Sequence, residues 1–336
     1  MGRAVAGIAL GVAIVVAGFV AAEIVLRATG SQDRTIEWTY PDTYFRRDAV
    51  GLLLPPAGRF PVVARRTDTG ATLYEVTYTI DEFGKRKTPV AAAQSRTKFA
   101  AFFGCSFTFG EGLDDDETLP YYFGTEAPEY VPYNFAFQGG GPFDAMARLD
   151  TYDAAAEIAE REGIAVYVYI DDHVNRLTDT TRTASWRRNA VYYEPGPDGR
   201  FEHRGTFRSA RPLRSTLFAL IGGSHVLRAL GVHWPTGIHD DAIELTAAAL
   251  ADFGRRFRDR VPGAELVVVA YPGQWASGKL GVHLETLGVR YYDFKDLFSS
   301  EDPEYRISDV DRHPNAKGQQ TLARALAREL GVGGGD

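Results

Sequence analysis

Continuous apolar runs constrain the fold of this 336-residue chain more than any other feature of its sequence. The runs are "KFAAFFG" at 98–104, "IAVYVYI" at 164–170, "AELVVVAYPG" at 264–273 and the weaker "YVPYNFAF" at 130–137. Runs without alternating polar positions are typical of strands that are buried on both faces. A shorter run at 289–294 predicts one further strand.

Segments of helical composition separate these runs. Helices are expected at 144–162, 240–260 and 315–330, and the second of them is amphipathic. Strands that alternate with helices favour a parallel sheet with helices on both faces. The sequence therefore predicts a three-layer α/β/α domain over residues 98–330.

The remaining segments are expected to form smaller parts around this domain. Residues 27–97 are interpreted as a linker and a small β-rich preface, because "ATLYEVTYTI" at 71–80 alternates like a strand. Residues 176–238 lack a clean period and are too long for a simple connection, so they are interpreted as an insertion or lid, with a hairpin at "PGPDG". The glycine-rich end, 331–336, is expected to be a flexible tail.

The N-terminus carries nineteen residues without a charge, at 4–22. About 20 apolar residues span a membrane as a helix, and Glu23 and Arg27 are spaced to pair on one helix face. We predict a single-pass anchor over 4–26 in the cell membrane, with the catalytic domain outside the cytoplasm. A cleaved signal peptide remains the alternative, because "VAA" before Glu23 resembles a cleavage site.

Composition argues against several classes of partner. A net charge of −7 and a pI near 5.6 argue against nucleic-acid binding. One cysteine, Cys105, excludes a disulfide within the chain and disfavours a thiolate metal site. The "DDH" at 171–173 is also a poor metal site, because adjacent side chains on an extended segment point apart. No metal or cofactor is expected, and the oligomeric state stays open.

Residues that follow the predicted strands could carry chemistry, because open α/β sheets bind ligands at the carboxyl ends of their strands. Ser106 is a candidate nucleophile, but a serine hydroxyl needs a base within hydrogen-bond reach. His313 could be that base, oriented by Asp311 or by Asp309. The backbone N–H of Gly139 could stabilise an oxyanion.

Three motifs in this order resemble the SGNH or GDSL hydrolases over residues 98–330. "GCSFTFG" at 104–110 resembles the block with the nucleophilic serine, "NFAFQGGGP" at 134–142 the block with an oxyanion-hole glycine, and "DRHPNAKG" at 311–318 the block with the histidine. The resemblance implies a flavodoxin-like sheet and a triad of Ser106, His313 and Asp311. It also implies an oxyanion hole that includes the N–H groups of Ser106 and Gly139.

The remaining block of the family departs from its usual pattern here. The family has Gly-x-Asn-Asp, whereas this chain has "YIDDHVN" at 169–175, with Asp171 at the asparagine position. An ionised carboxylate would repel an oxyanion, so Asn175 could reach in instead, Asp171 could be protonated, or two donors could suffice. The family also includes membrane-anchored polysaccharide O-acetyltransferases, which resemble this chain in their anchor and their Asp-x-His spacing.

Two functions follow as hypotheses. The first is a serine hydrolase that acts on acyl esters of a small molecule or glycan, or that transfers the acyl group to a glycan. The second is a catalytically weak module that binds a cell-envelope glycan or a partner protein through aromatic residues of the insertion, such as Trp186 and Trp234. Cys105 as the nucleophile, and Ser106 as a small residue chosen only for a turn, are the alternatives at the site.

Overall fold

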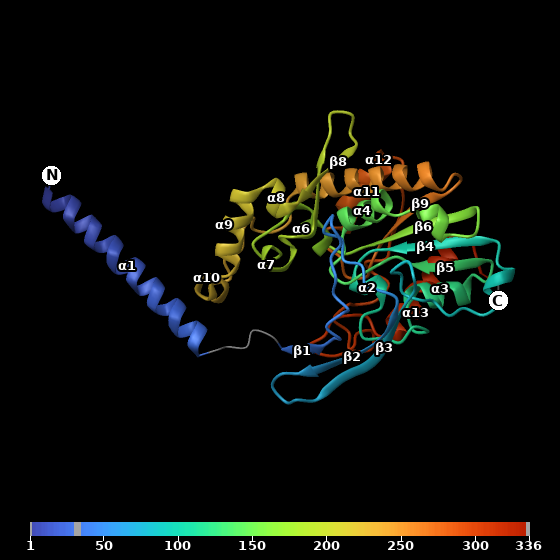
Figure 1. Cartoon of the computed structure of the whole chain (residues 1–336), viewed down its shortest axis with the longest axis horizontal. Helices are drawn as coiled ribbons and strands as arrows, with labels where there is room; N and C mark the ends of the chain where they lie inside the picture. Colours follow the sequence, from blue (N-terminus) through green and yellow to red (C-terminus); the bar gives the residue numbers. More distant parts are fainter. Residues whose placement is uncertain (1, 30–34, 334–336) are drawn as a thin grey trace.

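The computed structural model of the chain describes residues 2–29 and 35–333. The strands are β1 (Ile36–Thr39), β2 (Gly58–Arg66), β3 (Thr72–Ile80), β4 (Lys98–Phe103), β5 (Tyr130–Asn134), β6 (Glu162–Tyr169), β7 (Val191–Pro195), β8 (Phe201–Thr206), β9 (Glu265–Ala270) and β10 (Arg290–Asp293). The helices are α1 (Gly2–Ala28), α2 (Ser106–Phe109), α3 (Leu119–Glu126), α4 (Pro142–Thr151), α5 (Ala154–Glu157), α6 (Asp172–Thr178), α7 (Ala184–Arg187), α8 (Phe207–Ala210), α9 (Pro212–Gly222), α10 (His225–Ala229), α11 (Asp240–Arg260), α12 (Ser277–Thr286) and α13 (Ala316–Glu329), with a 3-10 turn η1 (Ala93–Ser95). Figure 1 shows their arrangement.

The central sheet has five parallel strands in the order β10-β9-β6-β4-β5. Numbered by their own sequence, these strands follow the doubly wound order 2-1-3-4-5 of flavodoxin-like sheets. The predicted α/β fold with a parallel, flavodoxin-like sheet is therefore confirmed. The three strongest apolar runs form β4, β6 and β9. Their residues are almost all buried, because helices cover both faces of the sheet.

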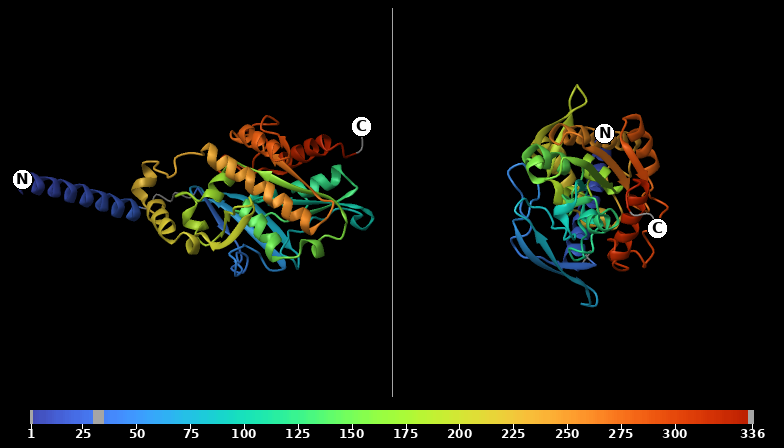
Figure 2. Two further views of the ribbon diagram at one scale, coloured as in Figure 1. Left: turned by 90° about the horizontal axis from the view of Figure 1, so that it is seen from above. Right: turned by 90° about the vertical axis from the view of Figure 1, so that its right-hand side faces the viewer.

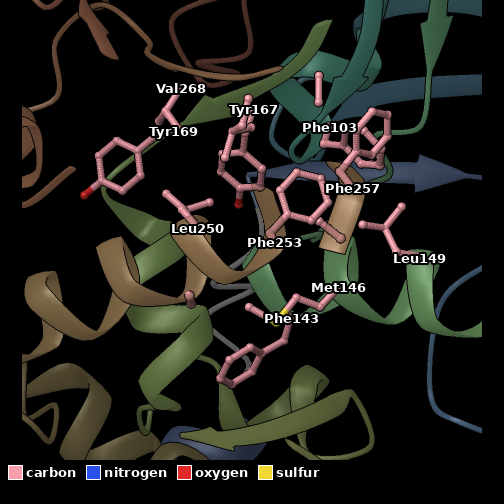
Figure 3. Close-up of a cluster of buried hydrophobic side chains, with 14 of the residues drawn as sticks. Phe103, Phe143, Met146, Leu149, Tyr167, Tyr169, Leu250, Phe253, Phe257 and Val268 are labelled. Atoms are coloured by element: carbon pink, nitrogen blue, oxygen red, sulfur yellow. The ribbon is translucent and has the colours of Figure 1, made fainter. Parts of the chain in front are cut away.

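Alternate residues of each strand supply the two sides of the core. Phe103 and Tyr167 point to the side of α4 and α11, where they pack with Phe253 and Phe257 (Figure 3). Phe102 and its neighbours on the opposite face pack against α3 and α13. The two clusters make the three-layer architecture seen edge-on in Figure 2.

The segment before the sheet forms a second, antiparallel sheet, β1-β2-β3. Its core contains Tyr44, Phe60 and Tyr78, and it packs against Phe109 of α2. The buried guanidinium of Arg86, just after β3, donates to the backbone carbonyls of Phe109, Gly110 and Leu113. The small sheet and the segment after it therefore pack directly against α2 and the loop that follows α2.

The insertion, residues 176–238, folds into a hairpin and a group of short helices. β7 and β8 pair antiparallel across the "PGPDG" turn, and α8, α9 and α10 follow. The predicted helix 144–162 is interrupted: α4 ends at Thr151, Tyr152 is extended, and β6 begins at Glu162.

The N-terminal helix α1 extends away from the rest of the molecule (Figure 1). Its segment Val5–Ala28 has a mean hydropathy of 2.6 and is long and apolar enough to cross a membrane by length and composition. Parts of two predicted segments, residues 30–34 of the linker and 334–336 of the tail, lie outside the described residues.

Candidate active site

Ser106 opens α2 directly after β4, on a turn that glycine makes possible. Gly104 has φ +149°, and a Cβ there would lie 2.3 Å from Thr108 Oγ1 and 3.0 Å from the carbonyl oxygen of Val168. Only glycine fits this backbone conformation and this close approach. The turn leaves Ser106, 7% exposed, at the carboxyl edge of the sheet.

His313 and Asp311 lie against Ser106 in a continuous hydrogen-bonded chain. Nε2 of His313 is 2.8 Å from Oγ of Ser106, and Nδ1 is 2.6 Å from Oδ1 of Asp311. The backbone N–H of His313 also donates to Oδ1 of Asp311 at 3.0 Å. Asn315 fixes this segment, because its side chain caps α13 and donates to the carbonyls of Glu304 and Arg306.

Asp309, the other candidate partner of His313, lies elsewhere. Its carboxylate accepts two hydrogen bonds from Arg66 of β2, at 2.7 and 2.8 Å, and its side chain is 67% exposed. The structure therefore brings Asp311, and not Asp309, to the imidazole.

Glu111 is a second carboxyl group at the same imidazole. It is 7% exposed, its Oε2 lies 3.7 Å from Nε2 of His313, and its Oε1 accepts a hydrogen bond from the hydroxyl of Tyr40 at 2.7 Å. Glu111 lies on the loop that Arg86 holds, and Tyr40 follows β1, so the small sheet contributes directly to the site.

The electrostatics of the site follow from burial and from these two carboxyl groups. Burial lowers the pKa of His313, but Glu111 and Asp311 outweigh it and the net shift is upward. Burial raises the pKa of Asp311, but its hydrogen bonds with His313 lower it more, so the pKa lies below its usual value. Burial also raises the pKa of Glu111, against the opposing effect of His313. The site therefore favours a charged imidazole more than water does.

The glycine loop 139–141 packs against the turn before Ser106. A Cβ on Gly140 would lie 2.5 Å from the carbonyl oxygen of Gly104, so the two backbones are in direct contact. Arg187 donates to the carbonyl of Gly139 at 2.6 Å, and Arg176 donates to that of Gly140 at 2.8 Å. Two arginines thus fix the orientation of this loop beside Ser106.

Asp171 and Asn175, the two residues considered for the departing block, have other contacts. The carboxylate of Asp171 accepts from the N–H groups of Trp275 and Ala276 and from the hydroxyl of Tyr169, so it joins the ends of β6 and β9. The amide of Asn175 donates to Asp172 at 3.3 Å. These contacts bring neither side chain to Ser106.

Arg176 is a cation at the site that the sequence reasoning missed. It is buried, contacts the side chain of Cys105, and forms an ion pair with Asp172 at 2.8 Å. Its charge acts on both Glu111 and His313. The signals for these missed residues were slight: Glu111 is a lone charge in "FGEG", and Arg176 follows directly after the departing block.

An apolar cavity of about 550 Å³ lies beside the glycine loop. Its lining comprises Phe45, Arg47, Leu53, Gln138, Gly139 and Trp186. The indole of Trp186 covers Gly139, because a Cβ on that glycine would lie 2.8 Å from the ring. A substrate group that reached Gly139 would therefore meet aromatic side chains.

Residues 2–29 and 35–333 contain no group of three or more His, Cys, Asp or Glu side chains arranged to hold a metal ion. His173, from the "DDH" segment, is buried, and its Nδ1 lies 3.0 Å from the hydroxyl of Tyr167. Asp172 pairs with Arg176. These side chains have structural partners of their own.

No family model and no curated protein matches the sequence. The structure is similar to an acetyl xylan esterase from Butyrivibrio proteoclasticus, with 12% identity over 80% of this chain and 68% of that chain and a TM-score of 0.41. It is also similar to a carbohydrate esterase family 2 enzyme from Corynascus thermopiles, with 14% identity, coverage of 80% and 77%, and a TM-score of 0.39. A member of the lipolytic G-D-S-L family from Veillonella parvula has 11% identity, coverage of 70% and 98%, and a TM-score of 0.38.

Proposed function

We propose that this chain is an SGNH-type serine hydrolase that acts on acyl esters. The observation that carries the proposal is the hydrogen-bonded chain from Ser106 Oγ through both ring nitrogens of His313 to Asp311 Oδ1. A hydroxyl, an imidazole and a buried carboxylate in this order form the arrangement that activates serine for attack on a carbonyl.

In the proposed mechanism, Oγ of Ser106 attacks the ester carbonyl while Nε2 of His313 takes the hydroxyl proton. The new C–O bond gives a tetrahedral oxyanion, and Asp311 accepts a hydrogen bond from Nδ1–H of the imidazolium. When the ester C–O bond breaks, Nε2 gives its proton to the leaving alcohol. A second hydroxyl compound, activated in the same way, then releases the acyl group and restores Ser106.

For the oxyanion, we propose the backbone N–H groups of Ser106 and Gly139 as donors. The N–H of Ser106 opens α2, where the first amides have no acceptor within the helix. The contact of the glycine loop with Gly104 supports the assignment of Gly139. Asn175 is not assigned this role, since its amide pairs with Asp172.

The acyl acceptor sets the reaction class. Water as acceptor makes the protein an esterase or deacetylase, and a glycan hydroxyl makes it an O-acyltransferase. The aromatic cavity beside Gly139 supports a substrate with an apolar or sugar-ring face, because such faces stack on indole and phenyl rings. We further propose that α1 anchors the protein in the cell membrane with the catalytic domain on the extracytoplasmic side.

The proposal is tested by turnover of p-nitrophenyl acetate by the full chain in detergent. Ser106→Ala should lower kcat by at least about 10³-fold, because triad members act as a unit. A fluorophosphonate probe should label Ser106, and Cys105→Ala should leave that labelling intact. Equal turnover by the native chain and Ser106→Ala would exclude the hydrolase proposal for short acyl esters and favour a binding module.

A further inference from the structure

The insertion presents a row of leucines to the outside of the molecule. Leu213, Leu217 and Leu220 of α9 are 87%, 52% and 69% exposed, and their spacing places them on one face of the helix. Leu230, which follows α10, is 71% exposed. Exposed apolar residues that gather in this way are unusual on a soluble surface and mark an interaction site.

The opposite face of α9 is packed, so the leucines are not exposed through a loose fold. Phe218 and Ser215 are both 0% exposed. The ring of Phe218 packs against Trp234 with centroids 5.2 Å apart and against Phe207 at 6.0 Å. Helix α9 therefore has one face in the insertion's core and one apolar face without a partner among the described residues.

Helix α1 ends at this same surface. The carboxylate of Glu23 accepts from the hydroxyl of Ser224 at 2.8 Å and from the N–H groups of His225 and Val226 at 3.0 and 3.1 Å. Arg27 donates to the carbonyl of Gly223 at 3.3 Å and pairs with Glu23 at 2.8 Å. The start of α10 is thus clamped to the last turns of the apolar helix, as Figure 1 shows.

The charge of the segment differs from that of the chain. Residues 203–239 contain five arginines and no aspartate or glutamate, whereas the whole chain has a net charge of −7. Two of the five, Arg204 and Arg211, pair with Glu202 and Glu194 of the β7–β8 hairpin. The helices themselves carry Arg208, Arg214 and Arg228. Basic residues beside exposed apolar side chains are typical of segments that lie on anionic lipid surfaces. A partner protein is the alternative occupant. Lipid is favoured, because the surface is hydrogen-bonded to the end of a helix that is long and apolar enough to cross a membrane.

We infer that the exposed face of α9, together with Leu230, lies on the surface of the lipid bilayer beside the α1 anchor. The face is defined by Leu213, Leu217, Leu220 and Leu230, and it is called the leucine face below. Its occupant is the headgroup and upper acyl region of an anionic phospholipid membrane. The leucine face goes beyond the proposed hydrolase activity, since neither its residues nor its contacts involve Ser106 or His313.

The leucine face is tested with the full chain reconstituted in vesicles of phosphatidylcholine and phosphatidylglycerol. Leu217→Cys and Leu220→Cys carry an environment-sensitive nitrobenzoxadiazole label, and a doxyl-labelled lipid serves as quencher. Thr125→Cys is the control, because it is exposed on α3 at the opposite end of the domain (Figure 1). The native chain is the labelling blank, since Cys105 is fully buried, and circular dichroism checks the fold of each variant.

We expect several-fold stronger quenching at positions 217 and 220 than at position 125. We also expect this difference to shrink in vesicles of phosphatidylcholine alone, where the arginines lose their anionic partners. Quenching at 217 and 220 that is no stronger than at 125 would overturn the inference. An emission shift at 217 that grows with protein concentration but resists the lipid quencher would instead assign the face to a second copy of the chain.

Discussion

The imidazole of His313 lies between two carboxyl groups, one near each ring nitrogen. Asp311 accepts at Nδ1 over 2.6 Å, while Oε2 of Glu111 lies 3.7 Å from Nε2. Glu111 therefore faces the nitrogen that must exchange a proton with Ser106. A carboxylate there stabilises the imidazolium, which helps proton uptake but holds the proton more tightly at low pH.

This arrangement gives a prediction for the pH profile. The mechanism needs neutral His313 in the free enzyme, so activity falls as the pH drops through a pKa that lies above its usual value. Glu111→Gln removes one source of that upward shift, so the acidic limb of kcat/KM should move to lower pH. Stopped assays of ester hydrolysis between pH 5 and 9 measure the limb. A limb that stays in place, or moves upward, would contradict the role of Glu111.

The two aspartates that precede His313 form a matched pair of test sites. Asp311→Asn should lower kcat by about 10⁴-fold, because the amide stabilises the wrong tautomer of the imidazole. Asp309→Asn should leave kcat within about twofold, since Asp309 is an exposed partner of Arg66 and such pairs contribute little. Steady-state kinetics of both variants decide the assignment, and the reverse order of effects would give the orienting role to Asp309.

At the scale of elements, the site depends on close contact between two glycine-containing loops. Gly140→Ala would bring a Cβ to 2.5 Å from the carbonyl oxygen of Gly104, so one loop must shift. Gly141→Ala is the matched control, because its Cβ would meet Arg176 at an ordinary 3.5 Å. We expect a loss of about 10²-fold in kcat/KM for the first variant and little change for the second. Similar kinetics of the two variants would show that loop contact does not position the reacting groups.

Asp179, at the end of α6, is a buried carboxyl group whose surroundings disfavour its ionised form. Burial raises the pKa of Asp179 from 3.8 to about 7, against the opposing effect of Arg187 and Arg214, and φ at this residue is +52°. A raised pKa means that the folded state binds the proton more tightly than the unfolded state. Asp179 therefore costs little stability below pH 4, and its cost grows until the pH passes about 7.

Asp179→Asn should remove this cost. Because a tenfold change in proton affinity corresponds to about 1.4 kcal/mol, the free energy of unfolding at pH 8 should rise by roughly 3–4 kcal/mol relative to the change at pH 4. Urea unfolding of the full chain in detergent at the two pH values measures it. An equal effect of the substitution at both pH values would mean that the carboxyl group is not the cause.

The elements that the sequence predicts well are those with a clear pattern. β4, β6 and β9 carry no charge after their first residue, and α11 and α13 are strongly amphipathic, so burial and periodicity agree. Helix α12 was missed because "SGKLGVHLET" contains two glycines, which weaken a helix. Tertiary packing explains one of them: a Cβ on Gly281 would lie 2.5 Å from the ring of Tyr291.

The site divides in the same way. Ser106, His313 and Asp311 could be singled out because each lies in a short local motif. Glu111, Tyr40 and Arg176 come together only when the small sheet packs against α2 and α6 brings Arg176 to Cys105, so no local pattern could connect them. Asp171 could not be interpreted either, because its partners Trp275 and Ala276 are more than a hundred residues away.

At the scale of the whole molecule, residues from the segment of the small sheet contact the site and the loops beside it. Tyr40 holds Glu111, Arg66 holds Asp309, and Arg86 holds the carbonyls after α2. A boundary at residue 97, between the β-rich preface and the α/β domain, stays a prediction from the sequence. We expect the small sheet and the parallel sheet to unfold together, because each of these contacts joins the segment of the small sheet to α2 or to a loop of the larger domain.

The fate of α1 is also a prediction for the whole molecule. Glu23 and Arg27 bind the start of α10, and both residues would stay in the chain after cleavage before Glu23, so these contacts are compatible with an anchor and with a cleaved signal peptide. We expect the chain to stay in the membrane fraction after carbonate extraction and its intact mass to include α1. A mature chain that begins at Glu23 would support the signal-peptide alternative and contradict the anchor.

The single thiol of the chain offers a way to watch the molecule open. Cys105 is adjacent to Ser106, is fully buried and contacts Arg176. A thiol reagent can reach it only when the turn that carries the nucleophile separates from its surroundings, so the labelling rate under native conditions measures the free energy of that opening. Ligands that bind only to the closed site should slow the reaction in proportion to their occupancy. The native chain, with Cys105 as its one thiol, can thus report ligand binding through the rate of thiol labelling.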